Sequence, residues 1–163
     1  MKATSPTAAR RAEARAGHRV EVQLATRAAG VPPAAELRRW ADAALQRPSE
    51  FAELVVRVVG RREGAQLNER YRGRPGATNV LSFPFEAPPG MESRCLGDVV
   101  ICAPVVQREA RAQGKAQEAH WAHMVVHGVL HLRGYDHRTE SEAGEMERLE
   151  TEILAGLGYG NPY

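Results

Sequence analysis

The order of apolar and polar positions predicts four β-strands, at residues 19–24, 54–59, 78–83 and 97–102. In the first, Val20, Val22 and Leu24 alternate with polar side chains, which is typical of a strand with one buried face. The second is a β-branched run, and the fourth is apolar enough for a central position in a sheet. Pro84 follows the third strand, which indicates that this strand lies at an edge or ends there.

Five further segments are predicted to be helices, at residues 35–45, 64–71, 104–114, 118–132 and 140–157. Most of them have apolar side chains three or four residues apart, and the third is bounded by a proline and a glycine. Strands that alternate with helices, followed by helices alone, indicate an α+β fold. We expect a single layer of about four mixed strands packed against about five helices.

The length of 163 residues suits one domain with a sizeable core. Residues 1–17 lack apolar periodicity and are expected to form a disordered basic arm, so the domain is predicted to cover residues 18–163. No run of 18 apolar residues occurs, so no membrane partner is expected. Cys95 and Cys102 provide no disulfide framework, which favours a cytoplasmic location.

The net charge is only +2, but the arginines are unevenly distributed. Residues 57–74 contain six arginines against two glutamates. A basic block of this kind can neutralise the phosphates of a nucleic acid and position its backbone. The basic residues of the arm have a simpler interpretation, because such tails are often only disordered and well solvated.

Three histidines, His127, His131 and His137, stand at a spacing typical of metal ligands. On a helix, residues four apart share a face, so His127 and His131 can point at one ion. Gly134 can take the left-handed conformation that ends a helix, and the chain can then bring His137 back to the same ion. Three imidazoles with one open position are typical of a catalytic zinc site, placed here on a long helix and the turn after it.

The same spacing occurs in the metzincin pattern H-E-x-x-H-x-x-G-x-x-H, in which the glutamate is the general base. In this chain Gly128 occupies the position of that glutamate. The ligand spacing is therefore kept while the peptidase base is missing. This difference favours a metal-dependent hydrolase other than a peptidase.

Two more histidines, His120 and His123, precede the motif. A ligand set of His123, His127 and His131 would spread its outer members by about 12 Å at 1.5 Å per residue, too far for one ion. His120 and His123 are therefore expected to support the ligands, to face the substrate or to be structural. Asp136 has two open interpretations: it orients a ligand through the second ring N–H, or it caps a turn.

The histidine motif, residues 127–137, resembles the signature of the YbeY family of bacterial endoribonucleases that mature ribosomal RNA. Four more blocks resemble the family in the same order, at residues 67–72, 78–84, 96–102 and 146–150. The resemblance covers about residues 20 to 158. One departure is Arg133, at a position that is usually apolar in the family, which is expected to add positive charge near the metal.

The resemblance implies a single-domain, zinc-dependent endoribonuclease that is specific for single strands. It implies a role in 16S rRNA 3′-end maturation and ribosome quality control, with the small ribosomal subunit and assembly proteins as partners. The family's ligands for one Zn²⁺ per chain fall on His127, His131 and His137, which agrees with the spacing argument. The family's functional arginine falls on Arg72, whose fixed charge suits phosphate binding.

Two alternatives to the nuclease stay open. One is a ribosome-assembly factor that binds rRNA or ribosomal proteins with little catalysis of its own. The other is a different metal-dependent hydrolase, such as a peptidase, against which Gly128 weighs. The open three-histidine site favours chemistry over binding alone.

Overall fold

The computed structural model describes residues 18–46 and 51–163, so the arm expected at residues 1–17 lies outside the described residues. The described elements are β1 (Arg19–Ala25), α2 (Ala34–Leu45), β2 (Glu53–Val59), α3 (Arg61–Arg72), β3 (Val80–Pro84), β4 (Cys95–Cys102), α4 (Ala103–Ala112), α5 (Gln117–Leu132) and α6 (Glu140–Gly156). This part of the chain thus has five helices and four strands, which confirms the predicted α+β fold.

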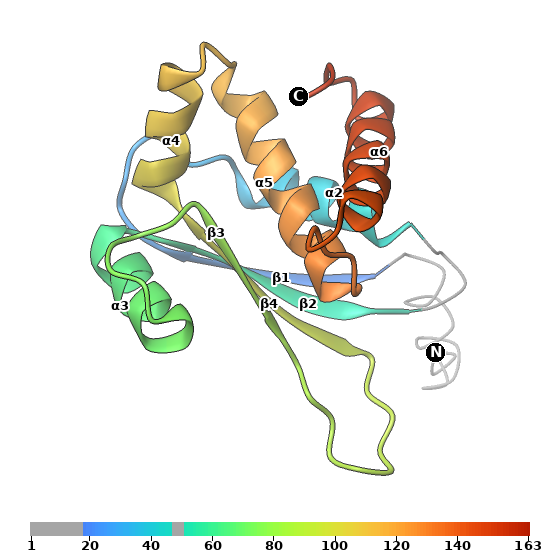
Figure 1. Ribbon diagram of the computed structural model, residues 1–163. Helices are drawn as coiled ribbons and strands as arrows, with labels where there is room; N and C mark the ends of the chain where they lie inside the picture. The colour runs from blue at the N-terminus through green and yellow to red at the C-terminus, as the bar shows by residue number, and fades with distance from the viewer. Residues whose placement is uncertain (1–17, 47–50) are drawn as a thin grey trace, which may run out of the picture.

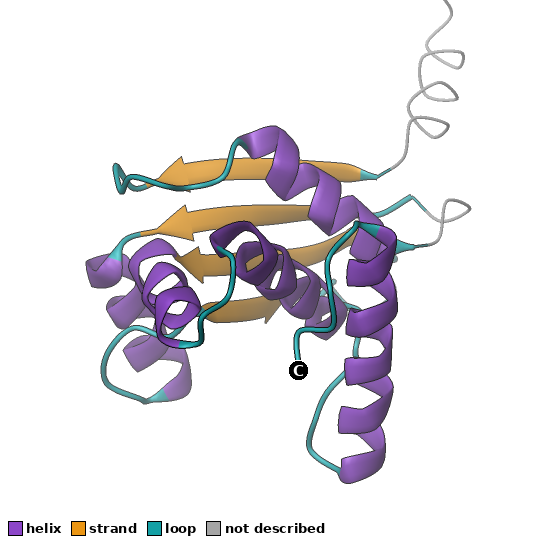
Figure 2. Ribbon diagram, turned by 90° about the horizontal axis from the view of Figure 1, so that it is seen from above, coloured by secondary structure: helices purple, strands orange, loops and turns teal. Residues whose placement is uncertain are grey.

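The strands form one mixed sheet in the order β1-β2-β4-β3 (Figure 2). Strands β1, β2 and β4 are parallel, and β3 pairs with β4 in the antiparallel direction. The apolar β4 therefore has neighbours on both sides, as predicted, and β3 ends at Pro84 on the edge. On the other edge, Val20 and Val22 pack against the core, but Leu24 is 53% exposed, so the buried face of β1 is shorter than predicted.

Both faces of the sheet are covered, but unequally (Figure 1). Val99 and Ile101 of β4 belong to the main core beneath α2, α5 and α6. Val100 and Cys102 alternate with them and belong to a smaller buried cluster on the opposite face, against which Leu67 of α3 packs. Alternation along β4 thus separates two cores, and α3 contacts α4 beside the smaller one.

Helix α5 is the centre of the main core and contacts β3, β4, α2, α4 and α6. Its approach to the sheet is closest at Gly128, where a Cβ atom would lie 2.5 Å from Val99 Cγ1 and 3.1 Å from Val80 Cγ2. The Ser82 hydroxyl of β3 donates a hydrogen bond to the Gly128 carbonyl at 2.8 Å. Although α5 is largely apolar, no helix in the described part of the chain is both long and apolar enough to cross a membrane.

Two glycine-to-alanine substitutions are expected to have opposite effects. Gly128→Ala should lower the free energy of unfolding by about 2 kcal/mol, because the new methyl group meets the stiff, β-branched Val99. Gly144→Ala should raise it by roughly 0.5–1 kcal/mol, because Gly144 lies inside α6 with nothing within 4 Å of an added Cβ. Urea unfolding of both variants checks this, and a Gly128→Ala variant as stable as the natural chain would contradict the close approach.

Candidate metal centre

The structure brings together the three histidines that the spacing singled out, His127, His131 and His137, called the histidine cluster below. His127 and His131 are one turn apart on α5, with ring centroids 4.7 Å apart. After α5 ends at Leu132, Gly134 takes a φ of +94° and reverses the chain. This turn places the His137 ring 5.2 Å from that of His131, so helix end and glycine turn together close the cluster.

The donor set of the cluster fits a metal ion with an open coordination position. One ring nitrogen of each histidine lies within 4.8 Å of the other two. Burial lowers the pKa of His131, and the neighbouring His127 and His137 rings lower it further, so its imidazole is neutral with a free lone pair at pH 7. The His137 side chain is 60% exposed, so the cluster opens to solvent on that side. Three imidazole nitrogens in this arrangement could hold a catalytic metal ion.

Glu150 of α6 fixes the orientation of His127 from behind. Its side chain is completely buried and accepts a hydrogen bond from His127 Nδ1 at 2.5 Å and another from His123 Nε2 at 3.0 Å. The Tyr163 hydroxyl also donates to this carboxylate. Because Nδ1 of His127 is occupied, Nε2 is the nitrogen available to a metal.

The carboxyl group of Glu150 is ionised despite its burial. Burial by itself raises the pKa, but the hydrogen bonds from His123 and His127 outweigh this effect and lower the pKa to about 2. The atoms of His123, His127 and Glu150 are also close enough to hold a metal ion. We assign them to a hydrogen-bonded support instead, because both histidines already donate hydrogen bonds to the Glu150 carboxylate.

Sequence reasoning missed Glu150 as a site residue, although Glu150 lies in the block at residues 146–150 that resembles the family. A signal was present in the helical spacing. Glu150 lies four residues after Met146 and three before Ile153, within the apolar stripe of α6. A carboxylate on a buried face is rare unless it is paired, so its position alone indicates a buried partner.

Asp136 shapes the turn that carries His137. Its carboxylate accepts the backbone N–H of His137 at 2.8 Å and forms an ion pair with Arg138 at 2.9 Å. The hydrogen bond from the His137 backbone lowers the pKa of Asp136. The ring nitrogen Nδ1 of His137 is 3.9 Å away, too far for a hydrogen bond. Of the two interpretations of Asp136, the turn cap is therefore the one that the contacts support.

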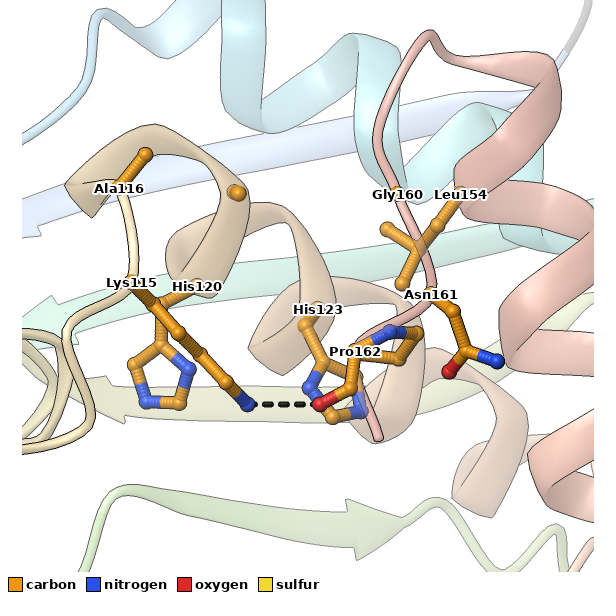
Figure 3. Close-up of a pocket in the computed structure, with 9 residues that line it drawn as sticks. Lys115, Ala116, His120, His123, Leu154, Gly160, Asn161 and Pro162 are labelled. Carbon is orange, nitrogen blue, oxygen red and sulfur yellow. Dashed lines mark hydrogen bonds between the residues drawn. The ribbon is translucent and has the colours of Figure 1, made fainter.

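His120 and His123 line a pocket that includes none of the three histidines of the cluster (Figure 3). Its rim includes the segment after α6, where Lys115 Nζ donates to the Pro162 carbonyl at 2.7 Å. His120 Nε2 lies 3.1 Å from the Glu109 carboxylate, and burial lowers the pKa of His120. Both rings are almost fully buried, so they support the fold and, through His123, the Glu150 carboxylate.

An open groove extends from the histidine cluster to the end of α3 and along β3. Arg72 and Arg74 line this groove together with Arg138. Helix α3 ends at Arg72 because Gly73 takes the left-handed conformation, and the chain then turns toward β3. The structure thus places Arg72, the arginine singled out from the sequence, in the same groove as the cluster.

Two other arginines are not where the sequence suggested. Arg57, in the basic block at residues 57–74, donates hydrogen bonds of 2.6 and 2.8 Å to the Glu63 carboxylate. This interaction lowers the pKa of Glu63. Arg133 was expected near the metal, but it donates to the Ala44 carbonyl at 2.8 Å and lines a different pocket. The expectation for Arg133 was wrong, because its side chain extends toward α2.

Comparisons with known proteins agree on one family. The family model described as endoribonuclease YbeY matches residues 9–158. The endoribonuclease YbeY of Methylococcus capsulatus is 62% identical over 133 residues, which cover 82% of this chain and 87% of that protein. The endoribonuclease YbeY of Alkalilimnicola ehrlichii is 61% identical over 139 residues, which cover 83% and 84%.

The fold agrees with a solved structure as well. The solution structure of a Thermotoga maritima protein matches with a TM-score of 0.58 at 24% identity, covering 85% of this chain and 91% of that one. At this identity the match supports the fold alone, and the family rests on the sequence matches. With the histidine cluster and the groove in the places described above, the chain belongs to the YbeY endoribonuclease family.

Proposed function

We propose that this protein is a zinc-dependent endoribonuclease that cleaves single-stranded RNA. The observation that carries the proposal is the histidine cluster, which opens into a groove lined by arginines. Curated relatives about 61% identical are named endoribonucleases, which supports RNA as the substrate. The proposed biological role is 16S rRNA 3′-end maturation and ribosome quality control in the cytoplasm, with the small ribosomal subunit and assembly proteins as partners.

Each residue of the site has a definite part in this proposal. His127, His131 and His137 would hold one Zn²⁺, which supplies Lewis-acid chemistry at the scissile phosphate. Glu150 keeps the His127 ring in one orientation and one tautomer. Arg72 binds the phosphate and stabilises the additional negative charge of the transition state. Arg74, exposed in the same groove, holds a neighbouring phosphate of the strand.

The Arg72→Ala variant is expected to cleave RNA about tenfold more slowly or worse, with zinc content unchanged, because it removes a charge from the phosphate but no metal ligand. The matched control is Arg62→Ala, since Arg62 is an exposed arginine of the same helix that does not line the groove. Steady-state cleavage of a labelled single-stranded RNA, with zinc measured on the same samples, gives both readouts. An equal loss of cleavage rate in Arg72→Ala and Arg62→Ala would indicate a general effect of positive charge and would contradict a specific role of Arg72.

The deciding experiment for the proposed function is cleavage of a 16S rRNA precursor with an extended 3′ end by purified protein. Activity that is lost with a chelator and restored by Zn²⁺ would support the proposal. Association with the small subunit without cleavage would favour the assembly-factor alternative. A peptidase is disfavoured by the position of Gly128, which is buried against Val99 and has no room for a base.

A further inference from the structure

Tyr71 is an exposed aromatic side chain beside the proposed catalytic site. It lies in the last turn of α3, is 59% exposed, and lines the same groove as the histidine cluster. The tryptophans Trp40 and Trp121, in contrast, are completely buried in the core. An aromatic ring at the surface of a charged groove contributes little to the stability of the core. The Tyr71 ring is instead available to bind a ligand in the groove.

The Tyr71 ring is held in place although it is exposed. The ring of Phe83 on β3 packs against it edge to face, with centroids 4.9 Å apart and an interplanar angle of 62°. The guanidinium carbon of Arg70 lies 5.7 Å from the Tyr71 centroid. Phe83 itself packs against the smaller buried cluster of the sheet, so the pair is anchored to the fold. A pre-oriented ring loses little entropy when a ligand stacks on it.

Arginines line the same groove as the Tyr71 ring. Arg72 directly follows Tyr71, and Arg74 lines the same groove two residues later. Guanidinium groups suit phosphates, and an aromatic face suits a nucleobase. Alternating phosphate and base contacts of this kind are how proteins bind a single strand, whose bases are free to be unstacked.

We propose that Tyr71 is a stacking platform for one unpaired base of the RNA strand, and that it selects single strands over duplex. This inference rests on the proposed nuclease function. A base within a duplex is already stacked on both faces and paired, so it offers no face to Tyr71. A duplex therefore gains only the phosphate contacts of the groove, while a single strand gains the stacking contact as well.

The test compares single-stranded and duplex RNA as substrates of the zinc-loaded enzyme. Tyr71→Leu is expected to reduce kcat/KM for the single strand about tenfold, mainly through KM, and to change kcat/KM for the duplex little. Tyr71→Phe and Tyr71→Trp keep an aromatic ring and should retain the single-strand preference. Leu24→Ala is the control, because it removes an exposed apolar side chain on β1, the opposite edge of the sheet from β3.

A second measurement does not depend on the stability of the leucine variant. The fluorescent base 2-aminopurine is placed at successive positions of a short single-stranded RNA. Its fluorescence is then followed when the RNA is rapidly mixed with the protein. The natural chain and Tyr71→Phe should both change the fluorescence at one position on binding. No change at any position, or an unaltered ratio of single-strand to duplex cleavage in Tyr71→Leu, would overturn the stacking role while the nuclease function stands. Absence of any RNA binding or cleavage by the natural chain would overturn both.

Discussion

We expect the His131→Ala variant to lose stoichiometric zinc and, with it, all RNA cleavage. The histidine cluster supplies three nitrogens within reach of one ion, and removing His131 leaves only two. Loss of a direct ligand should exceed the roughly 10- to 100-fold loss of affinity that follows removal of a partner behind a ligand. Zinc content after dialysis and cleavage of a labelled single-stranded RNA are measured on the same preparation.

His18→Ala is the matched control for this substitution. His18 lies far from the cluster in sequence and accepts a hydrogen bond from the backbone N–H of Ala52 at 3.0 Å. Its removal should leave the zinc content at one equivalent per chain. One equivalent of zinc in His131→Ala would refute the ligand assignment, and cleavage by zinc-free His131→Ala would indicate a contaminating nuclease.

The second large effect is expected for Glu150→Gln. This variant should bind zinc about 10- to 100-fold more weakly and lose about 3 kcal/mol of unfolding free energy. A glutamine side chain has one acceptor and one donor group, so it cannot accept from both His127 and His123 as the carboxylate does. The amide N–H would face a histidine N–H or force that ring into another tautomer.

Competition with a chromophoric chelator measures zinc affinity, and urea unfolding of the metal-free protein measures stability. Glu145→Gln is the control, because Glu145 is an exposed glutamate of the same helix. It should match the natural chain in both measurements. A Glu150→Gln variant with unchanged zinc affinity would show that Glu150 does not position His127.

The contribution of Glu150 to stability should depend on pH in a defined direction. Its pKa is lowered from an ordinary value of 4.5 to about 2 in the folded protein, so the unfolded chain takes up a proton first as pH falls. The stabilisation is fully present above about pH 4.5 and is lost as pH falls toward 2. The difference in unfolding free energy between the natural chain and Glu150→Gln should shrink over this range, and a constant difference would contradict the assigned pKa.

The elements of the fold could be predicted well because they depend on local patterns. The β-branched run at residues 54–59 and the apolar run at residues 97–102 are strands in the structure. The histidine cluster was equally accessible, since helical spacing and the Gly134 turn are local in the chain. Its predicted positions come from a stretch of only eleven residues, 127–137.

Contacts between distant segments could not be predicted in this way. Glu150 meets His127 only because α6 packs against α5, and nothing in the spacing of either helix alone specifies that pairing. Arg133 directly follows α5 in sequence, yet its side chain reaches the end of α2. Arg57 is six residues from its partner Glu63, but the pair forms because a strand and a helix are adjacent. In each case, tertiary packing decides which charge is available to a ligand.

The close contact at Gly128 also restricts what chemistry this scaffold can acquire by mutation. The position that bears the general base in metzincin peptidases points here into the sheet, toward Val99 and Val80. A single codon change to glutamate would bury a charge between two valines before it supplied a base. A mutation toward peptidase activity at this position would therefore lower the stability of the folded chain. Substitutions in the exposed groove, which can change the substrate, would cost less stability than this substitution, which would change the reaction.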